Sequence, residues 1–366
     1  MNFSIERSVF LNLLKKVQGI TEKNPIIPMS SNVLIESEKK KIIMQATNLE
    51  VGIIIEGNAN VEKKGKAVLD ARKTYEIVRE MPEGDVYVSR KETGWMEIKQ
   101  EKIIFNIAGQ SDEEFPQIER GEEVEFLEME AESVLYLVKN TLYATSDDIT
   151  RGVLRGVLVE REGGVVRLVA TDGHRLAMAE VKAPGGEAKG AVIIPEKGAR
   201  EIKRLTEETS EKEIKVGFGE RSVVVKTPEE TLVVRLMEGD FPDYKRVVPK
   251  GNKNVLVMRT QDLMETVKRV ALLAEDETKI VRFDLKKGRM IVSSSKAGQG
   301  EAREEKAVDY EGEEIVFGLN SRYVVDVLNT KGGGDVMIEL LDGKTPVLMR
   351  EKGNEGTIAV IMPMIL

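Results

Sequence analysis

Three stretches of the sequence share one order, an apolar strand-like run followed by an amphipathic helix: VLDARKTYEIV (68–78), VIIPEKGAREI (192–202) and VFGLNSRYVVDVL (316–328). Asp70, Pro195 and Asn320 occupy the same position in these stretches, and the spacing is 125 residues both times (70 to 195, and 195 to 320). A constant long period is the sequence signature of an internal repeat. We therefore predict three copies of one structural unit.

Two further markers recur with a similar period. A proline that closes each unit stands in EEFPQI, GDFPDY and IMPMIL, at Pro116, Pro242 and Pro363. An apolar position in the first amphipathic segment of each unit recurs at Leu13, Val138 and Val267. Together these markers predict three domains, 1–122, 123–249 and 250–366.

Short runs rich in Val and Ile lie between the helical segments and are bounded by turn-forming residues, as expected for strands. Examples are KIIMQAT (41–47), RSVVVKT (221–227) and KIVRFDL (279–285). Each unit is then an α+β domain in which two helices cover antiparallel sheets. The predicted fold is three such domains in tandem.

The composition argues against several classes of protein. No apolar run approaches the roughly 18 residues that span a bilayer, so we expect a cytoplasmic protein without a membrane partner. The chain has no cysteine and a single histidine, His174, which excludes disulfides, zinc-thiolate sites and His-rich metal sites. We expect no metal and no cofactor.

The charge balance restricts how the protein could contact nucleic acid. The chain has 55 Lys and Arg against 63 Asp and Glu, a formal net charge of −8, so any DNA contact requires a segregated basic surface. Aromatic residues make up only 5%, which argues against a single-strand binder that stacks bases on aromatic rings. Duplex DNA remains compatible with the composition.

The predicted helices carry positive charge on the face opposite their apolar stripe. In the first helix, Leu13 and Val17 lie in the stripe, whereas Lys15 and Lys16 point outward; in the second unit the outward residues are Lys139 and Asn140. The basic positions predicted to face DNA are Lys15, Lys16, Arg72, Lys73, Arg79, Lys139, Lys197, Arg200, Arg204, Lys268, Arg269 and Arg322.

A single basic helix face is usually only a solvated surface. The same pattern on several helices of an acidic chain instead favours contacts with phosphates, which give affinity without reading the base sequence. A hole lined by these helices fits the charge distribution better than a groove.

Three motifs resemble a known family. ATDGHRLA (170–177), GDFPDYKRVVPK (239–250) and VIMPMIL (360–366) are similar to the bacterial DNA polymerase III beta subunits, the sliding clamps, and the similarity runs through the whole chain. The resemblance implies a non-catalytic processivity factor, a head-to-tail homodimer that forms a six-domain ring around duplex DNA. Its implied partners are the polymerase III alpha subunit, the clamp loader delta subunit, and other polymerases and repair proteins that carry clamp-binding peptides.

The resemblance also implies particular contacts. At the dimer interface, Phe105 and Ile107 would lie opposite Leu272 and Leu273. Asn24 stands in a loop where family members carry an arginine that touches DNA, and the neighbouring Lys23 is the implied substitute.

The family's partner peptides bind in a hydrophobic pocket between the second and third domains. Its deep part corresponds here to Leu154, Thr171, Gly173, His174, Arg175, Leu176, Pro242, Val247, Val360 and Met362. Its shallow extension corresponds to Tyr323, Pro346, Pro363 and Met364. Ile365 departs from the family, which often has arginine there, so one polar contact at the rim is lost.

Other readings of the sequence remain open. His174 beside Asp172 could suggest a catalytic base, but no second histidine, cysteine or GxSxG serine accompanies it, and a turn or pocket residue fits better. A protein-only adaptor that binds linear peptides without encircling DNA, or an unrecognised enzyme, is the alternative function.

Overall fold

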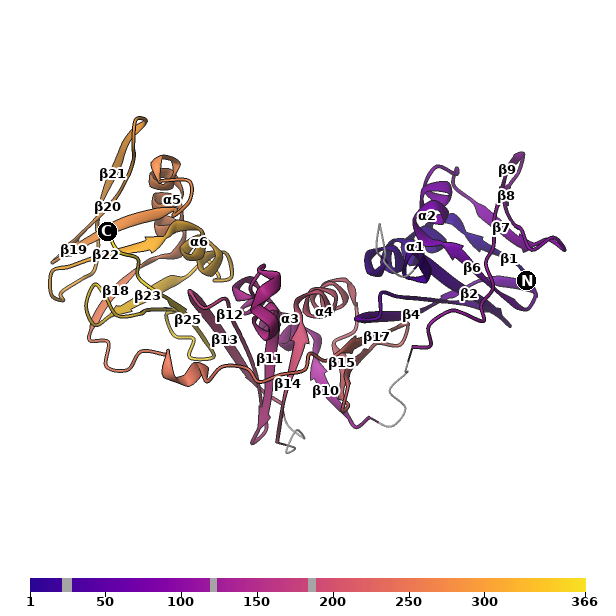
Figure 1. Ribbon diagram of the computed structural model, residues 1–366, viewed down its shortest axis with the longest axis horizontal. Coiled ribbons are helices and arrows are strands. Elements are labelled where there is room, and N and C mark those ends of the chain that lie inside the picture. Colours follow the sequence, from indigo (N-terminus) through magenta and orange to yellow (C-terminus); the bar gives the residue numbers. More distant parts are fainter. Residues whose placement is uncertain (22–27, 119–123, 184–188) are drawn as a thin grey trace. The chain divides into compact units, whose positions relative to one another are not determined.

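The computed structural model describes residues 1–21, 28–118, 124–183 and 189–366 (Figure 1). One element order occurs three times: a strand, a helix, four or five strands, a second helix and three strands. The predicted α+β fold with three repeats is therefore confirmed. The predicted domain boundary near 122 lies outside the described residues.

The helices of the described residues are α1 (Arg7–Ile20), α2 (Ala71–Arg79), α3 (Ala131–Lys139), α4 (Glu196–Glu208), α5 (Thr260–Val270) and α6 (Ser321–Asn329). The first repeat has strands β1 (Asn2–Glu6), β2 (Asn32–Glu38), β3 (Lys41–Thr47), β4 (Val51–Asn58), β5 (Asn60–Lys63), β6 (Gly65–Asp70), β7 (Asp85–Arg90), β8 (Met96–Gln100) and β9 (Ile103–Ile107). The second has β10 (Phe126–Glu130), β11 (Gly156–Glu162), β12 (Val165–Thr171), β13 (Arg175–Lys182), β14 (Gly190–Pro195), β15 (Glu213–Phe218), β16 (Ser222–Lys226) and β17 (Glu230–Arg235). The third has β18 (Asn254–Arg259), β19 (Ile280–Lys286), β20 (Arg289–Lys296), β21 (Gly300–Ala307), β22 (Ile315–Asn320), β23 (Asp335–Leu340), β24 (Val347–Glu351) and β25 (Thr357–Ile361).

The residues that revealed the repeat end the strand before the second helix. Asp70, Pro195 and Asn320 are the last residues of β6, β14 and β22. Asp70 accepts a hydrogen bond from the backbone N–H of Lys73 at 2.6 Å, and Asn320 accepts one from Arg322 at 2.9 Å. These side chains satisfy N–H groups that the first helical turn leaves unpaired. The spacing that is repeated along the chain therefore marks the start of a helix.

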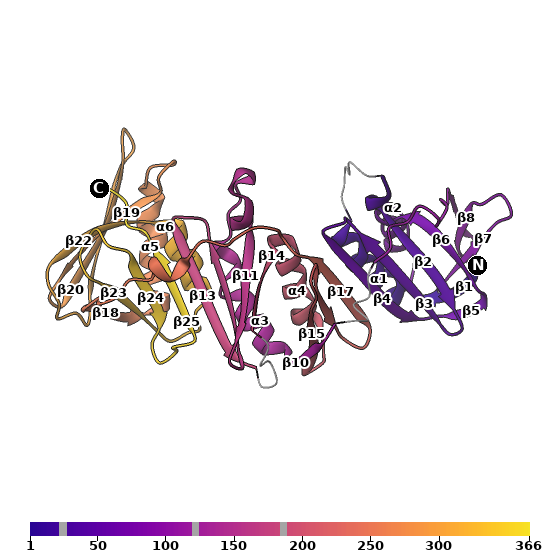
Figure 2. The same cartoon turned by 60° about the horizontal axis from the view of Figure 1, so that its bottom comes forward.

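The strands of the described residues form four antiparallel sheets, and two of these sheets combine strands of neighbouring repeats (Figure 2). The order β10-β15-β16-β17-β4-β3-β2-β6 joins the second repeat to the first through β17 and β4. The order β14-β11-β12-β13-β25-β24-β23-β18 joins it to the third through β13 and β25. A five-stranded sheet, β5-β1-β7-β8-β9, and a four-stranded sheet, β21-β20-β19-β22, belong to single repeats.

The chain divides into two compact units, Met1–Ala131 with Glu208–Leu236, and Glu132–Glu207 with Met237–Leu366. The middle repeat is divided between these units because its strands belong to two different sheets. The predicted boundaries near 122 and 249 therefore remain a prediction.

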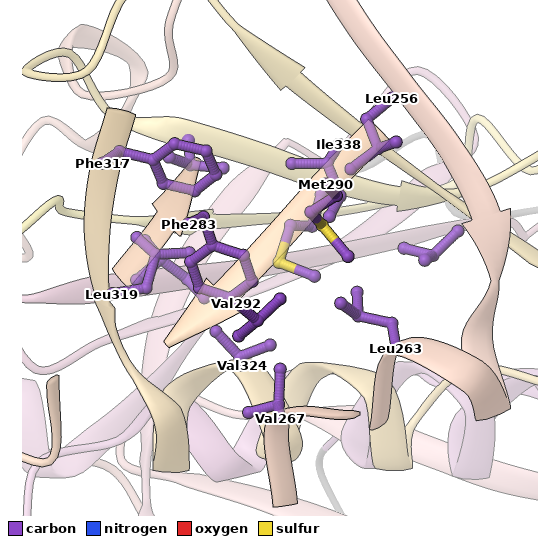
Figure 3. Packing of buried hydrophobic residues seen from close by; sticks show 14 of the residues in the cluster. Leu256, Leu263, Val267, Phe283, Met290, Val292, Phe317, Leu319, Val324 and Ile338 are labelled. Carbon is purple, nitrogen blue, oxygen red and sulfur yellow. The ribbon is translucent and has the colours of Figure 1, made fainter. Parts of the chain in front are cut away.

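Helices and sheets meet at apolar faces, as the predicted stripes require. In the third repeat, Leu263 and Val267 of α5 and Val324 of α6 point toward the strands and are at most 1% exposed (Figure 3). Phe283 and Phe317 stack on one another in the same cluster, with ring centroids 5.0 Å apart. None of the helices in the described ranges is long and apolar enough to cross a membrane.

Candidate functional site

One hollow collects the residues of the predicted deep pocket. It has a volume of about 140 Å³ and lies where the hairpin β12–β13, β25 and the segment before β18 meet within one compact unit. It is lined by Leu154, Thr171, Gly173, His174, Arg175, Leu176, Pro242, Asp243, Tyr244, Val247, Val360 and Met362. All ten residues assigned to the deep part are brought together, and Asp243 and Tyr244 are additional.

The turn between β12 and β13 is fixed by its own side chains. The Thr171 hydroxyl accepts from the N–H of Gly173 and donates to the carbonyl of Arg175 at 2.6 Å. One carboxylate oxygen of Asp172 accepts from the backbone N–H groups of His174 and Arg175, at 2.9 and 3.0 Å. These bonds form an Asx-type turn, which holds one wall of the hollow in a defined shape.

Arg175 ties this wall to α6. Its guanidinium donates to Asp172 at 2.9 Å and to Asp326 of α6, and it lies 4.4 Å from the ring centroid of Tyr323 and 5.6 Å from that of Tyr143. Burial alone would lower the pKa of Arg175, but the two carboxylates outweigh it and raise that pKa. The guanidinium is thus held by two carboxylates of the protein, and at the hollow it positions the turn.

Tyr244 forms part of the lining that the sequence did not predict. It is 6% exposed, and its hydroxyl donates to Glu160 at 2.6 Å. Burial, together with the neighbouring Glu160, raises its pKa to about 12. Tyr244 lies inside the quoted GDFPDYKRVVPK motif, so the motif contained the signal although the residue was not selected.

The predicted shallow extension does not belong to this hollow. Pro346 lines an adjoining hollow of about 660 Å³, whose lining shares Val247 and Met362 with the first. The C-terminal tail is held by the N–H of Met362, which donates to the His174 carbonyl at 2.9 Å. The N–H of Met364 likewise donates to Gly318 at 2.8 Å.

The predicted apolar stripes of the helices are confirmed, but two outward positions are wrong. Lys16 is only 16% exposed at its side chain, because its ammonium pairs with Glu230 at 2.8 Å and with Glu208 at 3.8 Å. Asn140 is buried, and its side chain donates to the carbonyl of Tyr136 at 2.9 Å.

The other basic positions differ in how far they are neutralised. Exposed residues with a carboxylate partner are Arg72, Lys73, Arg79, Arg200 and Arg269. Lys15, Lys139, Lys268 and Arg322 are exposed without an ion pair to the described residues. Lys197 and Arg204 are half-buried, and Arg204 pairs with the buried Glu201 at 2.8 Å. Lys23 lies outside the described residues.

The predicted interface residues lie at the two terminal sheets. Phe105 is 38% exposed, and it and Ile107 belong to β9, the edge strand of the five-stranded sheet. Leu272 is 80% exposed, and Leu273 follows it in a short helical turn, η5 (Ala271–Leu273), in contact with β21. An apolar edge strand exposed in this way is a surface for pairing with another chain.

The comparisons with known proteins agree over the whole chain. Family models of the DNA polymerase III beta subunit match for its N-terminal domain (residues 1–119), central domain (128–243) and C-terminal domain (245–365). A beta sliding clamp of Pseudomonas putida is 31% identical and one of Caulobacter vibrioides is 32% identical, each over 100% of both chains.

Solved structures give the same result. A Pseudomonas aeruginosa sliding clamp bound to griselimycin is similar with a TM-score of 0.95 and 31% identity, over 100% of both chains. A Caulobacter crescentus beta sliding clamp with bound polyethylene glycol is similar with a TM-score of 0.96 and 31% identity, over 100% of this chain and 99% of that one.

Proposed function

Because the chain belongs to the DNA polymerase III beta subunit family, the beta sliding clamps, we propose that two copies close head to tail into a ring around duplex DNA. As a beta sliding clamp the protein is a non-catalytic processivity factor of DNA replication. The proposal concerns how this chain performs that task. The observation that carries it is the way in which the repeats join.

The two junctions between repeats follow one rule. The last strand of the second repeat, β17, pairs with β4, the third strand after α1. The last strand of the third repeat, β25, pairs with β13, the third strand after α3. By the same rule, β9, the last strand of the first repeat, should pair with β21, the third strand after α5. Both β9 and β21 are edge strands in the described residues, and a second copy would supply each with its partner.

The β13–β25 junction, taken as the template, gives a register for this pairing. Val347 begins β24 and pairs with Ile361, which in turn pairs with Arg175, the first residue of β13. Met96 begins β8 and pairs with Ile107, so Ile107 should lie opposite Gly300, the first residue of β21.

This register supports the interface that the family resemblance implied. A Cβ atom at Gly300 would lie 3.7 Å from Leu273 Cδ1. Ile107 of one copy would therefore lie beside Leu273 of the other, and the apolar side chains of the edge strand β9 would be buried away from water.

The exposed cations of the helices would face the phosphates of the enclosed duplex. A sliding protein requires contacts that do not depend on base sequence, and Lys and Arg next to phosphates provide such contacts. In this role the protein works in the cytoplasm, at the nucleoid. We also propose domains 1–122, 123–249 and 250–366 as the units of the ring.

The hollow at β13 and β25 is proposed to bind short peptides of the polymerase III alpha subunit, the clamp loader delta subunit and other polymerases and repair proteins. Its lining is largely apolar, with a wall held rigid by the turn at Asp172. A preformed apolar pocket suits the anchor residues of a short peptide because little ordering is required on binding.

The ring is tested by its topology. Protein loaded onto nicked circular DNA should remain bound during gel filtration, and cutting the circle once should release it, since a ring slides off a free end. A protein-only adaptor would not be retained on either form of the DNA. Retention that is unchanged after linearisation would contradict the ring and indicate ordinary DNA binding.

A further inference from the structure

A second hollow lies at the other junction between repeats, where β17 pairs with β4. It has a volume of about 300 Å³, and its eleven lining residues all belong to one compact unit. They come from the end of β3, the turn after it and the start of β4, and from the segment that holds Pro116. The others come from β16 and β17 and from the turn before β16. None of these residues belongs to the site described above.

The turn in this hollow repeats the bonds of the turn at the first hollow. The Thr47 hydroxyl accepts from the N–H of Leu49 and donates to the carbonyl of Val51, as Thr171 does with its own two partners. One side-chain oxygen of Asn48 accepts from the N–H groups of Glu50 and Val51, in the place where Asp172 serves the first hollow.

The register of the sheets extends this equivalence to the whole lining. Gly52 pairs with Val233 as Leu176 pairs with Val360, and Pro116 stands in the position of Pro242. The correspondence is counted along the paired strands and, outside them, from Pro116 and Pro242. Each of the eleven described lining residues then corresponds to one that lines the first hollow or the adjoining one. The two hollows are therefore copies of one site in two repeats.

The two copies place their cations at different positions, since the linings of the first hollow and the adjoining one contain Arg175, Lys245, Arg246 and Lys250. Arg235 takes the position of Met362, and Arg221 takes that of Thr345. Both arginines are exposed, and neither forms an ion pair with the residues that the structure describes. Glu50, in the position of His174, is the one carboxylate among the described residues of the lining, so within this set two guanidinium groups face one acid.

The remaining lining is suited to a small apolar anchor. Val233 is 9% exposed, and the Ile118 side chain packs directly over Gly52, 3.0 Å from where a Cβ atom would lie. Leu49 is 44% exposed at the mouth, in a backbone conformation with φ of 73°. An apolar floor beside two free guanidinium groups complements a leucine-like side chain next to a carboxylate.

We propose that the hollow at the β4 and β17 junction is a second docking site, for a linear peptide with an apolar anchor flanked by acidic residues. The argument rests in part on the peptide-binding role proposed for the first hollow, of which this is the repeat counterpart. The second copy would recognise the acidic flank through Arg221 and Arg235, at positions where the first copy has Thr345 and Met362. A ring would then offer partners two separate docking places.

The test uses the full chain and two fluorescein-labelled, C-terminally amidated peptides, Ser-Asp-Asp-Leu-Leu-Ser and its counterpart with asparagine for both aspartates. Fluorescence anisotropy measures their binding to the wild type, to Arg221→Ala/Arg235→Ala, and to a chain that lacks residues 362–366. The acidic peptide should bind the chain that lacks residues 362–366, in which the first hollow is incomplete. Adding Arg221→Ala/Arg235→Ala to that truncated chain should weaken this binding roughly tenfold or more, since two charge-assisted contacts are lost.

The neutral peptide separates this inference from the proposed function. Its binding should be lost on truncation and unchanged in the double variant; if truncation has no effect on it, the first pocket is assigned wrongly. An acidic peptide that fails to bind the truncated chain at millimolar concentration, or binds it equally well after both arginines are replaced, overturns the second site. Equal displacement by inorganic phosphate would also overturn it, in favour of a simple anion site. Both arginines are exposed, so circular dichroism and sedimentation of the double variant should match the wild type.

Discussion

At the scale of the residue, Arg175 shows how one side chain defines the pocket without forming its apolar surface. Its guanidinium links Asp172 in the turn to Asp326 in α6 and lies over the rings of Tyr143 and Tyr323. The turn, the helix and the shallow residue Tyr323 are thus positioned by a single charge. Only 11% of this side chain is exposed, so solvent screens the two ion pairs weakly.

We expect Arg175→Ala to destabilise the unit that contains it by about 3 kcal/mol, because it leaves carboxylates behind without their partner. Urea denaturation followed by circular dichroism would measure the change. Arg151→Ala is the matched control, since Arg151 is 43% exposed and pairs with the exposed Asp148. That variant should lose less than about 1 kcal/mol. Equal losses in the two variants would show that Arg175 has no special structural role.

At the scale of the element, each helix has a buried apolar stripe and an outer face, but its cations are not equivalent. Arg204 neutralises the buried Glu201, and Lys16 neutralises the buried Glu230, so reversing their charge would destabilise the fold as well as any DNA contact. Lys139, Lys268 and Arg322 are exposed without such partners in the described chain. Together with Lys15, these three are therefore the informative positions for a DNA-facing surface.

The triple variant Lys139→Glu, Lys268→Glu, Arg322→Glu should be loaded poorly on nicked circular DNA. It should also dissociate from the DNA at a lower salt concentration than the wild type, because counterion release scales with the number of phosphate contacts. A matched control reverses three exposed lysines that lie outside the helices and have no ion pair to the described residues, at Lys40, Lys64 and Lys182. The control should load normally. If both variants lose binding equally, net charge and not the helix faces governs the interaction.

The C-terminal tail is the second element whose role can be separated from folding. Met362 and Met364 each donate one backbone hydrogen bond, and Ile365 is 96% exposed. Deleting residues 362–366 should weaken the binding of a polymerase-derived peptide by roughly 2 kcal/mol or more, since the deletion removes one wall of the hollow. Calorimetry would measure this loss, and Ile365→Ala should leave the affinity unchanged. A truncated chain with wild-type affinity would place the pocket elsewhere.

At the scale of the whole molecule, the repeats form a series with two free ends. Each internal junction joins the last strand of one repeat to the third strand after the first helix of another, and β9 and β21 are left as edges within the described residues. Closure by a second copy turns this series into a ring with six equivalent junctions in the proposed dimer. The absence of cysteine makes the closure directly testable.

The register places Ile104 opposite Arg303, so Ile104→Cys with Arg303→Cys should form an intermolecular disulfide under mild oxidation, because directly opposed residues have Cβ atoms about 5 Å apart. Denaturing electrophoresis would detect the cross-linked dimer. Ile104→Cys with Glu304→Cys is the control, and its thiols should point to opposite faces of the sheet. Preferential cross-linking of the control pair would mean that the register is shifted.

The repeat, the fold class and the apolar faces of the helices could be predicted from the sequence, because these follow from local rules. Asp70 and Asn320 start helices by capping them, and periodic apolar residues such as Val267 must turn inward. The deep pocket was also predicted residue by residue, through motifs that resemble a known family.

Which charges lack an ion pair among the described residues, and where the second hollow lies, could be seen only in the three-dimensional structure. Lys16 and Asn140 were assigned outward from helical spacing, yet Lys16 meets Glu230 across 214 residues of chain, a partner that no local pattern reveals. The hollow at β4 and β17 combines the turn at Thr47 with Arg221 and Arg235. Pairings between distant strands depend on how the whole sheet assembles, so local sequence patterns cannot specify them.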